Sequence, residues 1–501
     1  MTTTSTDRTA VLTSTGPVIG NILSGVREFL GIPYAEDPIG PLRLAQPRPP
    51  AHWKDPLDAT RPGPAAPQAP SRLESVMGRP GGEVAEAGCL NINVWAPLAA
   101  TDLPVLFWVH GGALTSGSGA WNWYSGSHLA AEHGIVVVTF NYRLGPLGFL
   151  DPTELTNHLG PQNLGLLDAI LALEWTADNI AAFGGNPDLI TVGGQSSGAT
   201  IAALLAANEQ TKRHVRRIIM QSGTPDDPIP TQTESTRAAA EFFRILGVHP
   251  EDTNTIRALP ADHLIAANRE LIRRLGGPID LPIGLVRSAQ APWANVRAAI
   301  CDAVSPEIGI LMGTTSDEGH AFVSIETQTT ETDAITELDT LSNGRGLSLY
   351  RKYEALRPQG PPQSRVADYF TDTLFRSPTH QLAQDRAELG KPAYVYEFAW
   401  SASQLGAAHC IELPFLFGNR EAWADAPMLD GIDNAEFQDL STAFAGAFAS
   451  FVRTGNPHHQ ALPAWPTYEA THRSVLRFDS KIKAVSAQTK AHGGNNIKIR
   501  C

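Results

Sequence analysis

The stretch LITVGGQSSGATIAALLAAN, residues 189–208, decides the fold. Its first five residues are a short β-branched run typical of a buried strand, and residues 200–208 are typical of a helix. Between them, Gly194–Gly198 fits the pattern Gly-x-Ser-x-Gly, a tight strand-to-helix turn that exposes a serine hydroxyl. The helix N-terminus supplies N–H groups and a partial positive charge, both suited to a developing oxyanion. The stretch therefore indicates Ser196 as a candidate nucleophile.

These glycines allow two other interpretations. A phosphate-binding loop would need Gly-Lys-Ser/Thr after the glycines, or the spacing Gly-x-Gly-x-x-Gly, and neither is present. The glycines could also simply begin a packed helix. The strand before Ser196 and the helix after it favour the catalytic interpretation.

Further short apolar runs predict strands on both sides of this stretch, at residues 105–109, 135–140, 217–221, 309–313 and 393–400. Residues 165–183 have helical spacing. Alternation of strands and helices on this scale predicts an α/β fold with a mostly parallel sheet flanked by helices. No domain boundary is visible, so we predict one domain over residues 1–501, with a polar, exposed excursion at 324–345.

A loop of small residues follows the predicted strand at 105–109. It reads His110-Gly111-Gly112-Ala113, and such a loop can present successive backbone N–H groups to one point. A tetrahedral oxyanion needs two or three such donors. We predict that Gly112, Ala113 and Ser197 provide them, the alternative being a plain Gly-Gly turn. His110 is expected to be structural.

Composition excludes several classes of function. The 501 residues are 42% hydrophobic and 18% charged, which is the balance of a globular protein. A net charge of −13 disfavours nucleic acid and membrane surfaces as partners. The four cysteines form no C-x-x-C pair, so no metal site or cofactor is indicated. The first residues lack the pattern of a signal peptide, so a cytoplasmic protein is expected.

These motifs lie within a longer pattern that resembles the type-B carboxylesterase family of the α/β-hydrolase fold, which also includes the cholinesterases. The matching segments are 29–35, 89–90, 93–95, 141–143, 148–149, 183–187, 190–198 and 453–457. The resemblance runs from about residue 16 to 480 and is strongest to bacterial members of the para-nitrobenzyl-esterase kind. It implies one large, mostly parallel mixed sheet flanked by helices, with insertions over the active site.

A serine nucleophile needs a histidine base and a carboxylate that orients it. Fifteen histidines are available, and the residues alone do not choose among them. The resemblance implies His409 as the base. It also implies Glu318 as the acid, although the neighbouring Asp317 is chemically suitable too and is otherwise a capping or solvated residue. Ser222 matches a family serine that supports the acid and the histidine.

The sequence departs from the family at several positions. Gln195 replaces the glutamate common before the nucleophile, which makes choline-like cations less suitable substrates, although Glu412 retains a family acidic position. The glutamate that pairs with the position of Arg43 is missing, so this arginine needs another partner. Cys89 lacks its usual disulfide partner and is expected to be a free thiol. Cys410 is expected to pack rather than react.

We therefore predict a serine hydrolase that cleaves small-molecule carboxylic esters without a cofactor. Aromatic residues near the two loops are candidate walls of the substrate pocket, or else ordinary core: Trp121, Trp123, Tyr124, Phe415 and Phe417. Gln195 together with residues 409–412 also resembles phenylcarbamate-hydrolysing members, so cleavage of aryl carbamates or anilides is a second hypothesis. A non-catalytic interaction protein on the same fold is a third. The sequence specifies neither the physiological substrate nor the oligomeric state.

Overall fold

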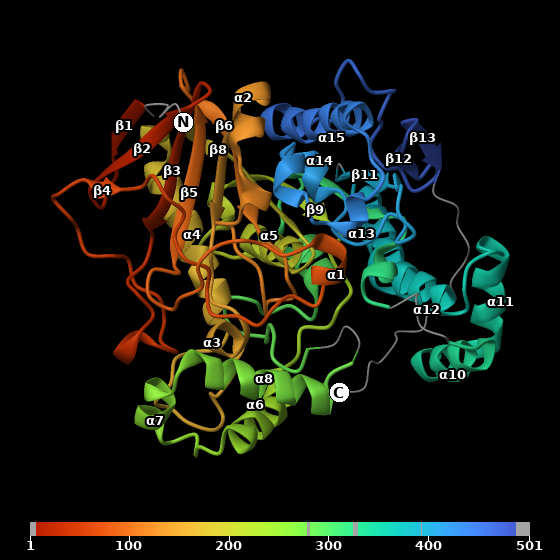
Figure 1. Ribbon diagram of the computed structural model, residues 1–501, viewed down its shortest axis with the longest axis horizontal. Coiled ribbons are helices and arrows are strands. Elements are labelled where there is room, and N and C mark those ends of the chain that lie inside the picture. Colours follow the sequence, from red (N-terminus) through yellow and green to blue (C-terminus); the bar gives the residue numbers. More distant parts are fainter. Residues whose placement is uncertain (1–6, 278–280, 324–328, 392, 487–501) are drawn as a thin grey trace.

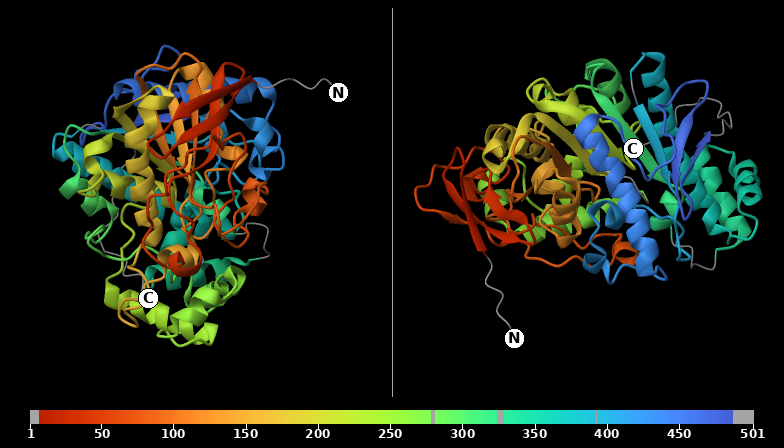
Figure 2. Two further views of the ribbon diagram at one scale, coloured as in Figure 1. Left: turned by 90° about the vertical axis from the view of Figure 1, so that its left-hand side faces the viewer. Right: turned by 90° about the horizontal axis from the view of Figure 1, so that it is seen from above.

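The computed structural model describes residues 7–277, 281–323, 329–391 and 393–486. In this part the chain forms one 13-stranded sheet with helices on both faces (Figures 1 and 2). The strands are β1 (Asp7–Leu12), β2 (Pro17–Leu23), β3 (Val26–Pro33), β4 (Leu57–Asp58), β5 (Asn91–Pro97), β6 (Leu103–Val109), β7 (Val136–Phe140), β8 (Gly185–Gln195), β9 (Val215–Gln221), β10 (Gly309–Thr315), β11 (Ala393–Phe398), β12 (Ser474–Phe478) and β13 (Lys483–Ser486).

The α-helices connect and cover these strands. They are α1 (Glu74–Met77), α2 (Ser127–His133), α3 (Gly145–Phe149), α4 (Leu164–Asn179), α5 (Ser197–Ala207), α6 (Gln232–Leu246), α7 (Thr253–Ala258), α8 (Ala261–Leu275), α9 (Val296–Ala303), α10 (Glu331–Ser342), α11 (Gly346–Leu356), α12 (Gln363–Phe370), α13 (Ser377–Glu388), α14 (Leu413–Phe417) and α15 (Asn434–Thr454).

The sheet is parallel in its centre and antiparallel at its edges. The strand order is β1-β2-β3-β5-β7-β6-β8-β9-β10-β11-β12-β13, with β4 beside β2. Every pairing from β7 to β12 is parallel. The pairings β1–β2, β2–β3, β3–β5, β5–β7 and β12–β13 are antiparallel, and the short β4 pairs with β2 in parallel. The carboxyl ends of the central strands therefore lie at one edge, where loops carry active sites in such sheets.

Strand β6 shows why the sheet has two covered faces. Val105 and Phe107 belong to the apolar cluster that includes α4 and α5, and Leu106 and Trp108 belong to the cluster that includes α2 and α15. Successive side chains of a strand point to opposite faces, so an uninterrupted apolar run is buried on both. The mixed, mostly parallel sheet predicted from the sequence is confirmed.

The predicted elements occur with shifted ends. The predicted strands become β6 to β11. Strands β6, β8, β9 and β10 are longer than predicted, whereas β7 is one residue shorter and β11 two residues shorter. The helix after Ser196 begins at once, at Ser197. The predicted helix at 165–183 ends at Asn179, and a 3₁₀ turn follows.

The expectation of an exposed excursion at 324–345 is partly wrong. Residues 324–328 lie outside the described residues, as do residues 1–6 of the N-terminal segment. Residues 331–342 form α10, which begins with a capping box at Thr330. This helix buries Ala334 and Leu338 in an apolar cluster shared with α11 and α12. Its apolar residues Ala334, Ile335, Leu338 and Leu341 have helical spacing and form the inner face, which the composition of the segment, rich in Thr, Glu and Asp, concealed.

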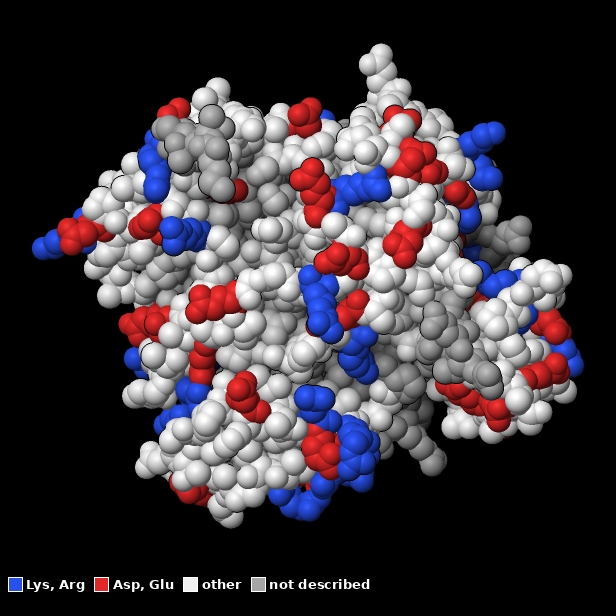
Figure 3. Space-filling view, viewed as in Figure 1, with Lys and Arg blue, Asp and Glu red and all other residues white. Residues whose placement is uncertain are grey.

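Two groups of helices lie on the lower side of the sheet in Figure 1, α6–α8 in one and α10–α12 in the other. Acidic and basic side chains are interspersed over this face of the molecule rather than gathered into a single-sign surface (Figure 3). Among the described residues, no helix is long and apolar enough to cross a membrane.

Candidate active site

Ser196 occupies the turn between β8 and α5. Its backbone has φ 57° and ψ −129°. A residue other than glycine adopts this strained conformation only where the surrounding fold imposes it. A Cβ atom at Gly194 would lie 2.4 Å from the Gly198 carbonyl, and one at Gly198 would lie 2.2 Å from the carbonyl oxygen of Val109. Both flanking glycines are therefore required, as the sequence pattern predicted. The half-buried Ser196 lines a cavity.

The loop after β6 runs along the same cavity. Gly112, Ala113 and Leu114 all have positive φ, at 114°, 55° and 59°. Such a run turns successive N–H groups toward one point. Within the described structure, the N–H groups of Gly112 and Ala113 donate to no protein acceptor. The loop is held near α5 because the Leu114 N–H donates to Oγ of Ser197 at 3.3 Å.

The third N–H group predicted for the oxyanion site belongs to the first residue of α5. The first N–H groups of a helix have no intrahelical acceptor. The Ser197 N–H is one of these groups, because α5 begins at Ser197, and its role as an oxyanion donor stays a prediction. His110 lies beneath this loop, stacked on Tyr142 with ring centres 4.4 Å apart. Burial lowers the pKa of His110 to about 4, which agrees with a structural role.

The structure brings His409 and Glu318 together. Nδ1 of His409 lies 2.5 Å from a carboxylate oxygen of Glu318, and both side chains are buried. The other carboxylate oxygen of Glu318 accepts the N–H of Thr315 at 2.8 Å. The carboxylate is thus held from two sides, at the end of β10.

Nε2 of His409 contacts the side-chain amide of Gln195. The two nitrogens are 3.1 Å apart. An amide NH₂ group only donates, so Nε2 accepts and the ring proton is on Nδ1, facing Glu318. This is the tautomer that a general base needs. Among the described residues, no hydrogen bond joins His409 to the Ser196 hydroxyl, although both residues line the one cavity.

Two phenylalanines that the sequence analysis missed enclose the His409 ring. The rings of Phe322 and Phe375 each lie 5.1 Å from it, centre to centre. Phe322 follows Glu318 by four residues and also lines the cavity, whereas Phe375 comes from the segment after α12. No pattern in the sequence marked either residue, because their approach to His409 depends on tertiary packing.

Glu412 is a second buried carboxyl group near Glu318. Burial, together with the charge of Glu318, raises the pKa of Glu412 to about 8. The hydroxyl of Ser222 donates to it at 3.4 Å. Ser222 therefore contacts Glu412 rather than the acid and the histidine, where the resemblance had placed it. Glu412 is neutral at pH 7, so one negative charge is removed from this apolar region.

Replacing Glu412 with glutamine is expected to stabilise the protein increasingly as pH rises from about 5 to about 8. In the folded state the pKa is raised from its ordinary value of 4.5, so the folded protein binds this proton more tightly than the unfolded chain does. The free energy of unfolding of the wild type therefore falls by on the order of 3 kcal/mol as pH rises through that window. The variant has no such carboxyl group, so its free energy of unfolding does not fall for this reason. Melting temperatures across the window measure it.

The matched control is Glu388→Gln, which changes an exposed glutamate at the end of α13. Its melting temperature should follow the wild type at every pH. If the melting temperatures of Glu412→Gln and the wild type differ by the same amount at pH 5 and at pH 8, the raised pKa of Glu412 is contradicted.

The cavity has a volume of about 380 Å³. Trp121, Trp123 and Tyr124 line it, as predicted, together with apolar residues from α1 and α8. The prediction for Phe415 and Phe417 is wrong, since both are fully buried in the core cluster of α14 and α15. They belong to a helix whose apolar face turns inward, so their nearness to His409 in the sequence does not bring them to the cavity.

Two of the expected departures from the family are resolved. Arg43 is buried and forms an ion pair with Glu86, which is therefore the other partner that this arginine needs. Cys89 is a free, buried thiol. Cys410 lines the cavity beside His409, and burial together with the charge of Glu412 raises its pKa, so it remains a thiol.

One cluster in the described structure has the composition of a metal site. Asp317, His320 and Asp368 bring potential ligand atoms within 4.8 Å of one another. The guanidinium group of Arg357, however, bonds both carboxylates. The cluster therefore already contains a positive charge that balances its acids. Asp317 is buried, so the expectation of a solvated side chain is wrong, and it stands at the N-cap of the turn Glu318–Ala321 without a side-chain capping bond.

Comparisons with known proteins identify the family of the chain. The chain matches the Carboxylesterase family over residues 7–495. It is 35% identical to a phenmedipham hydrolase of Pseudarthrobacter oxydans, covering 93% of this chain and 94% of that protein. It is 36% identical to a para-nitrobenzyl esterase of Bacillus subtilis (strain 168), covering 94% and 95%.

A solved structure of a PNB esterase superimposes with a TM-score of 0.80, at 33% identity, covering 95% of this chain and 97% of that one. This likeness confirms the α/β-hydrolase fold predicted from the sequence. Together with the family match over nearly the whole length, it shows that the chain belongs to the carboxylesterase family.

Proposed function

We propose that this protein hydrolyses carboxylic esters through an acyl-enzyme, with Ser196 as nucleophile, His409 as base and Glu318 as the acid that orients the base. The observation that carries the proposal is the convergence at one cavity. Ser196, His409 and the loop of Gly112 line the same 380 Å³ space, although they come from distant parts of the chain.

The proposed reaction uses each group once per half-reaction. The Ser196 hydroxyl attacks the ester carbonyl while Nε2 of His409 takes its proton. The oxyanion that forms accepts hydrogen bonds from the N–H groups of Gly112, Ala113 and Ser197. His409 then gives its proton to the leaving alcohol. Water repeats the sequence at the acyl-enzyme and releases the acid.

Gln195 changes its contact in this scheme. Its amide donates to Nε2 of His409 in the present structure, at 3.1 Å. A base whose lone pair already accepts a hydrogen bond cannot take the serine proton, so the imidazole turns from Gln195 to Ser196 as the reaction begins. Catalytic hydrogen bonds are often long or misaligned before substrate binds.

The lining of the cavity disfavours a cationic substrate. Its walls include indole and phenol rings, and the charged side chains among the described residues that line it are those of Arg72 and Arg269; none is acidic. Gln195, which faces His409, is uncharged. A cationic choline-like group would therefore find no counter-charge among these residues. We propose a small-molecule ester with apolar groups and no cationic group as the substrate class.

An aryl carbamate is the second candidate, favoured by the 35% identity to a phenmedipham hydrolase. Parallel measurements of kcat/KM on p-nitrophenyl esters of increasing acyl length and on phenmedipham separate the two. We expect the esters to be preferred by at least about tenfold, because a carbamate carbonyl is less electrophilic. A reversed preference would assign the carbamate as the main substrate.

A non-catalytic role on the same fold is disfavoured, because Ser196, Glu318 and His409 are all retained and the last two are in contact. One domain over the whole chain remains our proposal, supported by a sheet that includes strands from both ends. A cytoplasmic location also remains a proposal. It is supported by the free thiols of Cys89, Cys301 and Cys410.

A further inference from the structure

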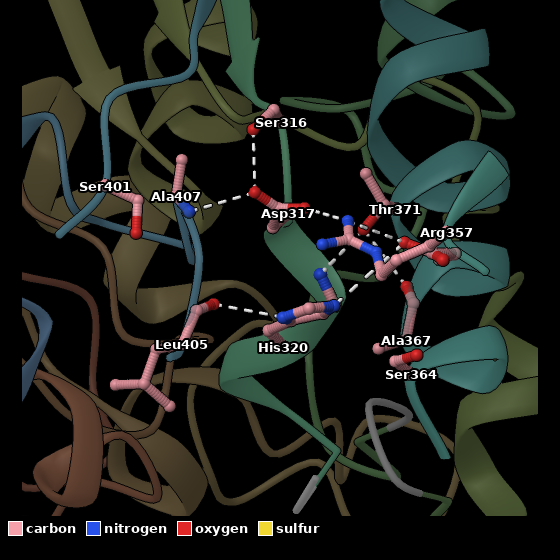
Figure 4. Close-up of polar contacts among 12 residues, drawn as sticks. Ser316, Asp317, His320, Arg357, Ser364, Ala367, Thr371, Ser401, Leu405 and Ala407 are labelled. Carbon is pink, nitrogen blue, oxygen red and sulfur yellow. Dashed lines mark hydrogen bonds and ion pairs between the residues drawn. The ribbon is translucent and has the colours of Figure 1, made fainter. Parts of the chain in front are cut away.

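Two loops that carry the proposed acid and base are joined directly to each other. Asp317 precedes Glu318, and its N–H donates to the carbonyl of Ala407 at 3.0 Å. The Ala407 N–H donates back to the Asp317 carboxylate at 2.9 Å. Nδ1 of His320 donates to the carbonyl of Leu405 at 3.0 Å. Figure 4 shows Asp317 and His320 facing this segment, two to four residues before His409.

The carboxylate of Asp317 is kept ionised in a buried position. Burial alone would raise its pKa, but the Arg357 guanidinium and neighbouring donors hold the pKa below its ordinary value. Arg357 extends from the end of α11 and also bonds Asp368 of α12 at 3.2 Å. The helix group α10–α12 thus holds the charged end of the contact in place.

His320 contributes its bond as a neutral ring. A carbonyl oxygen only accepts, so the Nδ1 that faces Leu405 carries the hydrogen. Burial lowers the pKa of His320, which keeps the ring uncharged and this tautomer available. Backbone spacing leaves little freedom here, since a Cβ atom at Gly406 would lie 2.8 Å from the Asp317 carboxylate.

We propose that Asp317 and His320 are positioning residues that fix the 405–409 loop on the acid loop, so that Nδ1 of His409 stays on Glu318. This inference rests on the proposed function. Neither residue contacts the reacting atoms; both act through the His409–Glu318 pair. The segment 405–407 has two such anchors to the acid loop, and loss of either lets the imidazole move relative to the carboxylate. Misplacement by about 1 Å can cost about 10²-fold in rate.

The test compares three variants in the full-length protein. His320→Ala removes the donor to Leu405, and His320→Asn retains a donor at nearly the same place as Nδ1. His380→Ala removes another largely buried histidine, which lies on α13 with its ring 5.9 Å from that of Tyr468. Among the described residues, no hydrogen bond joins His380 to the 405–409 loop. Active sites are counted with a fluorophosphonate, and kcat and KM are measured per active site on p-nitrophenyl acetate.

We expect His320→Ala to lower kcat per active site by about 10–30-fold while KM changes less than about twofold. His320→Asn should recover to within about threefold of wild type, and His380→Ala should retain wild-type kcat. If His320→Ala retains wild-type kcat per active site, or loses no more than His380→Ala, the positioning role is wrong. If the asparagine variant is as slow as the alanine variant, the Leu405 bond is not the cause.

A second variant pair covers the case in which His320→Ala does not fold. Asp317→Asn retains an oxygen that can accept the Ala407 N–H, whereas Asp317→Ala has none. The same order is expected, with the alanine variant at least about tenfold slower in kcat than the asparagine variant. Equal kcat values would overturn the inference. Failure of the proposed function is recognised separately, because wild type itself would then neither turn over the ester nor label.

Discussion

Ser196→Ala is expected to lower kcat on p-nitrophenyl acetate by at least about 10⁴-fold, because the variant cannot form the acyl-enzyme. Binding should persist, since the cavity walls and the loop of Gly112 are untouched. Residual hydrolysis above the uncatalysed rate is expected from the oxyanion donors alone. Steady-state rates measure the loss of kcat, and the burst of p-nitrophenol in the first turnover measures formation of the acyl-enzyme.

Ser441→Ala is the control for this loss. That serine is buried on α15 and donates to the carbonyl of Phe415, away from the cavity, so its variant should turn over esters at the wild-type rate. Wild-type activity or a retained burst in Ser196→Ala would assign the nucleophile elsewhere.

Glu318→Gln is expected to lower kcat by about 10⁴-fold with little change in structure. The amide would offer an NH₂ donor to Nδ1 of His409, which favours the opposite tautomer and leaves the imidazolium without a counter-charge. Nδ1 of His409 lies 2.5 Å from the buried Glu318 carboxylate, so replacing that carboxylate with an amide changes the hydrogen bond of the base itself. Steady-state kinetics with a melting curve separates the catalytic loss from unfolding.

The adjacent Asp317→Asn variant makes this test selective. Both residues are acids in the same loop, and the sequence alone left both open as the orienting acid. The structure turns Asp317 toward Ala407 and Arg357 instead, so its variant should lose far less than Glu318→Gln, at most about 10²-fold. The opposite order would exchange the roles of the two carboxylates.

The sequence predicted what local chemistry determines. The turn at Ser196 could be foreseen because only glycine fits at positions 194 and 198, where the Cβ distances of 2.2–2.4 Å leave no space. Buried parallel strands could be foreseen because uninterrupted apolar runs have few other solutions. The identities of the base and the acid came from the family resemblance, since spacing along the chain does not encode distance in space.

Tertiary contacts account for what the sequence missed. Glu86 pairs with Arg43 across 43 positions of the chain, a contact that no local pattern indicates. Phe322 and Phe375 approach His409 from two separate segments. The two hydrogen bonds between Asp317 and Ala407 depend on how the loops after the neighbouring strands β10 and β11 meet. Each of these is a consequence of packing rather than of local preference.

Peptide mapping by mass spectrometry after treatment with a fluorophosphonate tests whether Ser196 is the nucleophile that His409 activates. We expect one equivalent of adduct on Ser196, complete loss of esterase activity in parallel, and labelling slowed by at least about 10³-fold in His409→Ala. Adduct on another residue, or full esterase activity after Ser196 is modified, would contradict it.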